Sequence, residues 1–219
     1  ERWFSGLSSV WNLASSKAFM PLLVVMLLIH ATPTTLHPVL PIFVKGMGEE
    51  GRAASLAGIA FAVLGGAGIV ASYVTGILSQ HVSLVRLTVV MSMAGLVFAL
   101  PLLFVDSVPF LLLCIGLVGL CQGSLLSSAS AVVGSAVPRE NLGAAYGSVQ
   151  SASSIAFTGG PLLGGFLATT FGLRSAFTLV VVFYFLVLVI APNVFRQRLS
   201  SLSEDEGTNV VLPDGRDPG

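Results

Sequence analysis

The chain alternates between long apolar stretches and short polar segments. Six apolar stretches stand out: 19 to 44, 55 to 79, 84 to 105, 109 to 136, 142 to 170 and 174 to 194. Each has at least about 20 residues, the length that a helix needs to cross the hydrocarbon core of a bilayer. Runs such as "FTLVVVFYFLVLVI" lack the alternation of polar and apolar residues that a membrane barrel requires. The pattern therefore predicts an all-α membrane protein with six spanning helices.

Composition supports this prediction. Hydrophobic residues make up 54% of the chain and charged residues only 9%, whereas about a quarter of the residues in a soluble domain are charged. The 10 basic residues balance 10 acidic ones, so no positive excess indicates nucleic acid as a partner. We therefore expect the lipid bilayer to be the main environment of the chain.

The flanks divide the chain into three parts. Residues 1–17 place two tryptophans, a leucine and a valine on one helical face, which suits an interfacial segment, although a linker fits as well. Residues 18–195 form the expected six-helix transmembrane bundle. Residues 196–219 are polar and rich in turn-forming residues, which predicts a disordered cytoplasmic tail.

Basic residues near the helix ends predict the orientation. Lysine and arginine are enriched on the cytoplasmic side of membrane proteins. One side of the bundle carries Arg2, Lys17, Arg86, Arg139, Arg196 and Arg198, and the other side carries Lys45, Arg52 and Arg174. The larger group places both termini in the cytoplasm, and we expect a multi-pass protein of the plasma (inner) membrane.

Small residues recur at helical spacing in three of the stretches. These stripes are Ala144, Ser148, Ala152, Ala156, Gly160, Gly164 and Ala168; Gly119, Gly123, Ser127, Ala131 and Ser135; and Gly68, Ser72 and Gly76. Small residues let helix backbones approach closely in lipid, where the hydrophobic effect does not drive helices together. We therefore expect four inner helices, with the two stretches 84–105 and 174–194, which lack a stripe, facing lipid.

The two halves of the chain are weakly similar to each other. A shift of 89 positions superposes Gly58 on Gly147 and Gly76 on Gly165. The two helices compared would cross the membrane in opposite directions, so the repeat is inverted, with three helices followed by three. Nested inversion of this kind is found within each six-helix half of the major facilitator fold.

The segment "GSVQSASSIAFTGGPLLGG" carries a closer resemblance. It resembles the glycine and proline signature of proton-coupled drug antiporters in the major facilitator superfamily. The matching residues are Gly147, Gly160, Pro161, Gly164 and Gly165, while Ala156 replaces a glycine. The resemblance implies a six-helix half of a major facilitator fold, built as a 3+3 inverted repeat, and it assigns these six residues to helix packing and gating.

Two departures from the family's pattern indicate the second, C-terminal half. The loop "GILSQHVSLVR" keeps Gly76 and Arg86 of a loop motif found in first halves but lacks its aspartate, and the fourth helix lacks an arginine. The chain also has no methionine at position 1. We therefore expect it to be part of a longer protein, with an N-terminal six-helix half as its partner.

Polar residues at membrane depth are the candidate substrate contacts, because such residues are costly in lipid and often functional. The candidates are His30, Thr34, His37, Gln122, Ser124 and Gln150. Thr34 and His37 follow His30 on one helical face, and a histidine can also relay a proton near neutral pH. The alternative for each candidate is a structural hydrogen bond to another helix.

Other chemistry has little support in the sequence. Cys114 and Cys121 are separated by roughly 10 Å along one helix, too far for a disulfide. No Cys and His group has the spacing of a zinc site, and no glycine loop carries the Lys and Ser or Thr of a phosphate-binding loop. We therefore expect no metal, no cofactor and no enzymatic activity.

Acidic residues are missing from all six apolar stretches. The family resemblance implies protons as the coupling ion. A carboxylate that carries them is therefore expected in the other half, with His30 as a secondary candidate.

The expected function is secondary active transport of a small molecule. Efflux of amphiphilic compounds or drugs is favoured because the spanning stretches offer apolar residues with a few amides and hydroxyls. Uptake of sugars or organic acids uses the same fold and is the main alternative. Two further alternatives are an intramembrane serine protease, with His30 and Ser124 as its pair, and a complete six-helix channel or assembly subunit.

Overall fold

The computed structural model describes residues 19–135, 137 and 139–208. Its elements are α2 (Met20–Thr34), α3 (Val39–Gly46), α4 (Ala53–Leu78), α5 (Leu84–Ala99), η1 (Leu100–Phe104), α6 (Val108–Ser135), η2 (Arg139–Asn141), α7 (Leu142–Phe171) and α8 (Arg174–Thr208). Within the described residues, 6 helical spans are long and apolar enough to cross a membrane, which confirms the predicted number. The segment predicted as interfacial or linker, 1–17, lies outside the described residues.

The first span consists of two helices joined by the turn 35–38. Pro38 stands at the end of this turn, and because proline has no N–H and its ring clashes with a helical carbonyl, it cannot continue the hydrogen-bond ladder of α2. The turn is closed by a bond from Leu36 N to Pro33 O at 3.1 Å. The apolar pattern predicts one helix here, and the prolines divide it.

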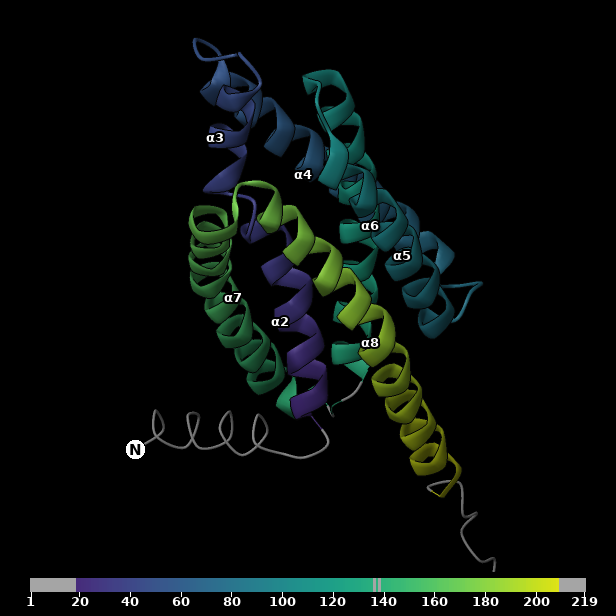
Figure 1. The fold of residues 1–219 in the computed structure, drawn as a ribbon. Helices are drawn as coiled ribbons and strands as arrows, with labels where there is room; N and C mark the ends of the chain where they lie inside the picture. Colours follow the sequence, from purple (N-terminus) through teal and green to yellow (C-terminus); the bar gives the residue numbers. More distant parts are fainter. Residues whose placement is uncertain (1–18, 136, 138, 209–219) are drawn as a thin grey trace, which may run out of the picture.

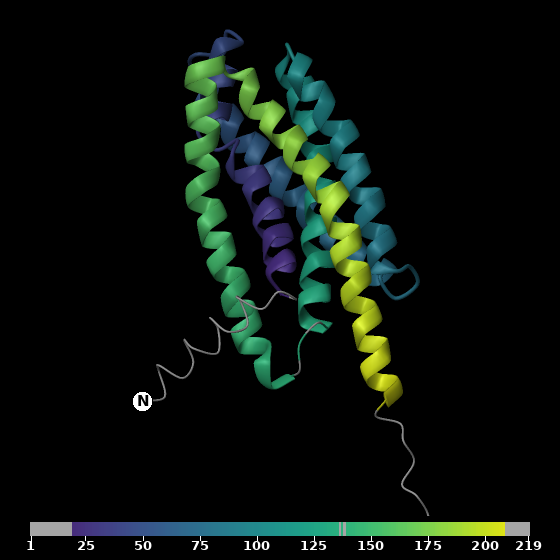
Figure 2. The same ribbon diagram turned by 60° about the horizontal axis from the view of Figure 1, so that its bottom comes forward.

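The last helix is longer than predicted. The sequence predicts a disordered tail from residue 196, but α8 continues to Thr208 and, in Figures 1 and 2, runs past the end of α2. A helix that has already formed gains one hydrogen bond per added residue without a new nucleation cost. Arginine, leucine and glutamate, each of which occurs twice between residues 196 and 208, are also good helix formers. Residues 209–219 lie outside the described part.

The helices form one bundle whose neighbours fit an inverted repeat. α2 lies along α7, and α4 crosses α6 (Figures 1 and 2). These pairs join the first span to the fifth and the second span to the fourth, and a shift of three helices converts one pair into the other. The same shift relates the contact of α5 with α6 to that of α8 with α2, and α5 packs on α8.

Glycines let α4 and α6 touch through their backbones. A Cβ at Gly123 would overlap the backbone of Gly68, and a Cβ at Gly119 would overlap the backbone of Leu64. Ser72 Oγ also donates to Gly123 O at 2.9 Å across this contact. The small residues predicted to permit close approach therefore lie where the two helices cross.

The predicted division into four inner and two outer helices does not hold within this chain. The third and sixth spans are 33% and 39% buried, whereas the second and fifth are only 17% buried. Tyr184 of α8 is 1% exposed and packs against Gly95 of α5, where a Cβ would overlap the ring. Gly95 thus makes room for Tyr184 where α5 packs on α8, while α4 and α7 each bury one narrow stripe and leave their other faces open.

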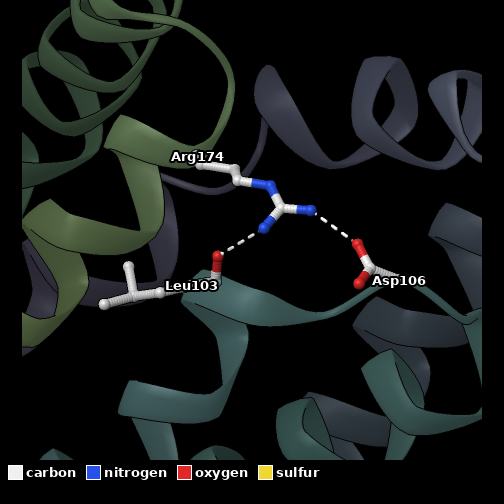
Figure 3. A network of polar contacts seen from close by, with 3 residues as sticks. All are labelled: Leu103, Asp106 and Arg174. Carbon is white, nitrogen blue, oxygen red and sulfur yellow. Dashed lines mark hydrogen bonds and ion pairs between the residues drawn. The ribbon is translucent and has the colours of Figure 1, made fainter.

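Arg174 connects the start of α8 to the segment between α5 and α6 (Figure 3). Its guanidinium lies 2.6 Å from Asp106 Oδ1 and donates a second bond to Leu103 O at 2.8 Å. Both charged side chains are more than half exposed, so water screens the ion pair. The hydrogen bond from Arg174 to Leu103 O is a second attachment between the start of α8 and the segment that precedes α6.

We expect Arg174→Met to lower the thermal stability of the purified protein more than Asp106→Asn does. The Asn variant loses an exposed ion pair, worth about 1 kcal/mol or less. The Met variant loses that pair and also the donor to Leu103 O. Thermal unfolding followed by circular dichroism measures both variants, and equal losses would show that the carbonyl bond contributes nothing.

Candidate functional site

One side of α2 is left uncovered by the other helices, and we call it the open face. It consists of Val24, Leu27, His30 and, in the turn after α2, His37. Val24 is 41% exposed and His37 is exposed, while Leu27 and His30 are half-buried. The remaining sides of α2 pack on α6, α7 and α8. The open face therefore carries two apolar side chains and two imidazoles, with no formally charged residue among them.

His30 is held by its own helix. Its Nδ1 lies 2.8 Å from Met26 O, one turn earlier. Because a carbonyl only accepts, Nδ1 carries the hydrogen, and in the neutral imidazole Nε2 is then an acceptor. No described residue forms a hydrogen bond with Nε2. The ring meets Phe157 of α7 edge-on, with centroids 6.2 Å apart.

His37 has the same kind of neighbour on the other side. Its ring lies 5.0 Å from that of Phe61 of α4, at an interplanar angle of 88°. The two imidazoles of the open face are thus each flanked by a phenylalanine, one from α7 and one from α4. Aromatic faces attract organic cations and pack against apolar rings.

Gln150 lies on α7, with its side chain exposed. Ser154 and Phe157 follow it on the same side, since four and seven residues make about one and two helical turns. Ser154 Oγ donates to the backbone carbonyl of Gln150 at 2.9 Å. This bond does not involve the side-chain amide of Gln150. Gln150 therefore lies along the same edge of α7 that meets His30.

Thr34 lies away from the open face, contrary to its predicted place beside the two histidines. It is 1% exposed, and its Oγ1 lies 3.1 Å from Ala156 O of α7. A Cβ at Gly160 would overlap this hydroxyl, and a Cβ at Gly164 would overlap the carbonyl of Thr35. The motif glycines thus lie where α7 contacts the end of α2.

Gln122 and Ser124 are also engaged between helices. Ser124 Oγ accepts from Thr75 Oγ1 of α4 at 2.9 Å. Gln122 Nε2 donates to Ile29 O of α2. The structural alternative, a bond to another helix, therefore describes both residues better than a substrate contact does. Ser124 and His30 form their hydrogen bonds with other groups, so they do not form the pair that a serine protease requires.

The remaining motif residues of α7 lie outside the contact with α2. The helix continues through Pro161, whose missing N–H deprives Phe157 O of its helical donor. A Cβ at Gly165 would meet no atom within 4 Å. Gly147 is half-buried, and its carbonyl accepts from Ser151 Oγ at 3.0 Å. A gating role for these residues stays a prediction.

No metal-binding group is found in the described part of the chain, where His, Cys, Asp and Glu do not gather in threes. Cys114 and Cys121 are both buried and unpaired with each other. The donor atoms available at the open face are the ring nitrogens of His30 and His37. The ring of His30 lies beside Phe157, and the ring of His37 lies beside Phe61. This arrangement favours an organic ligand over an ion.

Residues 7–211 match the family model described as Major Facilitator Superfamily. The chain belongs to this superfamily. Membership agrees with the six spans and with the contacts of the inverted repeat, and it confirms the resemblance found in the glycine and proline motif. The chain is therefore a multi-pass membrane protein with the six-helix fold of a major facilitator half.

Several relatives in the superfamily are named for drug efflux. The chain is 30% identical over 170 residues to the multi-drug resistance efflux pump PmrA of Streptococcus pneumoniae, a match that covers 77% of this chain and 42% of the pump. It is 32% identical over 150 residues to a PmrA homolog of Lactococcus lactis, covering 65% of the chain and 35% of that protein. It is also 34% identical over 82 residues to the multidrug resistance protein MdtG of Dickeya zeae, a match that covers 37% of this chain and 20% of that protein. The chain spans less than half the length of these relatives.

Phe61 and Phe157 are not among the residues predicted from the sequence. An aromatic residue inside an apolar run is usually a packing residue and does not stand out by type. The available signal was spacing, since Phe157 follows Gln150 by seven residues on the same face of α7. No comparable signal marks Phe61, whose neighbour His37 lies on another helix.

We expect Gly160→Ala to destabilise the protein and Gly159→Ala to leave its stability nearly unchanged. The added methyl at 160 would overlap Thr34 Oγ1, whereas a Cβ at 159 would meet no atom within 4 Å. Overpacking of this kind costs about 1–3 kcal/mol. Thermal unfolding of the two variants, purified in parallel, gives the comparison. Similar midpoints would show that α2 moves aside at no cost.

Proposed function

We propose that this chain is the second six-helix half of a secondary transporter that exports amphiphilic compounds, including drugs. The observation that carries the proposal is the open face of α2, where His30 and His37 are flanked by Phe157 and Phe61. This lining combines aromatic rings with uncharged polar atoms, which suits molecules that are part apolar and part polar. Relatives named for multidrug efflux and multidrug resistance support the same substrate class.

The proposed partner of the chain is a first six-helix half. Large apolar side chains are exposed on α4 and α7, and the largest include Ile69 and Tyr73 on α4 and Leu162 and Phe166 on α7. Lipid would cover these side chains, but it would not bond to the exposed side-chain amide of Gln150. The matched pump is also more than twice as long as its matched part. A second half beside α4 and α7 accounts for both observations.

The proposed coupling ion is the proton, and its carrier is proposed to lie in that other half. The only acidic residues in this chain are Glu1, Glu49, Glu50, Asp106, Glu140 and those after residue 200, and none of them lies inside a spanning stretch. His30 is the secondary candidate, because Nε2 presents an unshared electron pair on the open face. We also propose that both termini lie in the cytoplasm of a plasma (inner) membrane, as the lysine and arginine count indicates.

Uptake of sugars or organic acids is the second candidate function. Organic acids are anions, and the open face has no arginine or lysine to bind them. Sugars require many hydrogen bonds, whereas Thr34, Gln122 and Ser124 already bond to other helices. An assay that compares export of an amphiphilic cation such as ethidium with uptake of a labelled sugar, in cells producing the full-length protein, separates the two functions. Sugar uptake without ethidium export would overturn the proposal.

We expect His30→Gln to raise the KM for ethidium severalfold. Glutamine keeps a polar group at this place but removes the aromatic ring that lies edge-on to Phe157, and aromatic rings attract organic cations and stack on apolar rings. His81→Gln is the control, because His81 lies in the turn between α4 and α5. Initial rates of ethidium export in membrane vesicles give the KM of both variants, and an unchanged KM in His30→Gln would exclude the role.

A further inference from the structure

Gln122 takes part in a polar network that connects three helices inside the bundle. Its Nε2 donates to Ile29 O of α2. Its Oε1 lies 3.4 Å from the hydroxyl of Tyr184 on α8, and that hydroxyl lies 3.2 Å from Val118 O on α6. All of these atoms belong to spanning segments, where water is not available to replace a missing partner.

The carbonyl that Gln122 reaches is the one that Pro33 leaves without a helical donor. In an α-helix the N–H of residue 33 would bond to the oxygen of residue 29, and proline has no N–H. Nearby threonine hydroxyls bond to other carbonyls: Thr32 to Leu28 O and Thr35 to Ala31 O. The Gln122 amide therefore replaces the missing hydrogen bond of α2 with one from α6.

The bond to Ile29 O fixes the orientation of this amide, because a carbonyl only accepts and the amide must present Nε2 to it. The ring of Tyr184, which is fully enclosed and packs in the space that Gly95 leaves on α5, lies beside the other end of the amide. Its hydroxyl has one hydrogen, which is shared between Val118 O at 3.2 Å and Gln122 Oε1 at 3.4 Å. Reversing the amide would place oxygen against oxygen at Ile29.

The turn 35–38 begins just beyond this attachment, and the two parts of the first span have different neighbours. α2 packs mainly on α7 and α8, whereas α3 packs mainly on α4. A movement of α4 with α3 would therefore bend the span at the turn. Such bending would also pull on the weakened ladder around Pro33 unless another helix held it.

We propose that Gln122 is a positioning residue for transport. By replacing the donor that Pro33 lacks, it holds α2 to α6 and α8 and confines bending of the first span to the turn 35–38. The inference rests on the proposed function for its link to transport. The hydrogen-bonding part concerns this chain alone.

A double-mutant cycle tests the replacement of the missing donor. Gln122→Met keeps a similar shape but has no amide, so Ile29 O loses its partner. Pro33→Ala restores an N–H at position 33, so α2 can then supply the bond itself. We expect Gln122→Met to weaken α2, and Pro33→Ala added to Gln122→Met to restore it. A residue that merely fills space would not be rescued by a change in the backbone of another helix. Gln80→Met, in the exposed turn after α4, is the matched control.

Hydrogen exchange followed by mass spectrometry, on the full-length protein in detergent, measures α2 without any substrate. For Gln122→Met we expect exchange in residues 29–38 to accelerate about fivefold or more, the effect of losing one hydrogen bond of about 1–2 kcal/mol. The double variant should exchange within about twofold of Pro33→Ala alone. Gln80→Met should exchange within about twofold of the wild type. Unchanged exchange in Gln122→Met, or no rescue in the double variant, would overturn the inference.

Ethidium export by the wild type and by the same variants tests the link to transport. We expect Gln122→Met to lower the maximal rate about fivefold or more with KM changed less than about twofold, because the open face itself is unaltered. The double variant should recover the rate. Wild-type export with an unchanged rate in Gln122→Met would overturn the positioning role. If the exchange results hold but even the wild type exports no amphiphile, the hydrogen-bond replacement stands and the proposed function fails.

Discussion

Inside a bilayer, no water is present to donate a hydrogen bond to a peptide carbonyl that has lost its helical donor. This constraint explains several features around the first span. Pro33 removes the donor for Ile29 O, and a glutamine from α6 takes its place. Thr34 bonds across to α7 at Ala156 O. The polar residues that the sequence offers as substrate contacts are partly consumed in this way, because the prolines create a demand for hydrogen bonds that only other helices satisfy.

Close approach of backbones is the second consequence of a lipid environment. Without a hydrophobic drive between helices, contact depends on dispersion and short polar bonds, which both require small residues. The fold uses this contact twice, once where Gly160 and Gly164 meet α2 and once where Gly119 and Gly123 meet α4. The two contacts correspond under the three-helix repeat. The repeat is therefore visible both in the order of helices and in the chemistry of their contacts.

The spans, the stripes and the family could be predicted from the sequence because each is encoded locally, by the length of an apolar run or by spacing along one helix. The partners of polar residues could not be predicted. Whether Gln122 faces a cavity or Ile29 O depends on the rotation of α6 relative to α2, which no local pattern records. Gly95 was missed for a related reason, since a single glycine has no period and its importance comes from Tyr184 on another helix. The division of the first span at 35–38 was missed because helices in lipid often continue through a proline, and α7 does so through Pro161.

Among the candidate substrate contacts, His30, His37 and Gln150 have side-chain polar atoms that are not used in hydrogen bonds to the other described helices. Under the proposed function, their surroundings would suit chemically varied cargo. Phenylalanine rings and imidazoles contribute contact area and a few hydrogen-bonding atoms without a fixed charge, so they favour amphiphilic molecules without demanding one arrangement of polar groups. A fixed arginine or carboxylate would instead select strongly by charge. Under the proposed function, selection by charge would fall to the other half, while the glycine contacts and the bond between Gln122 and Ile29 shape the uncharged open face of this one.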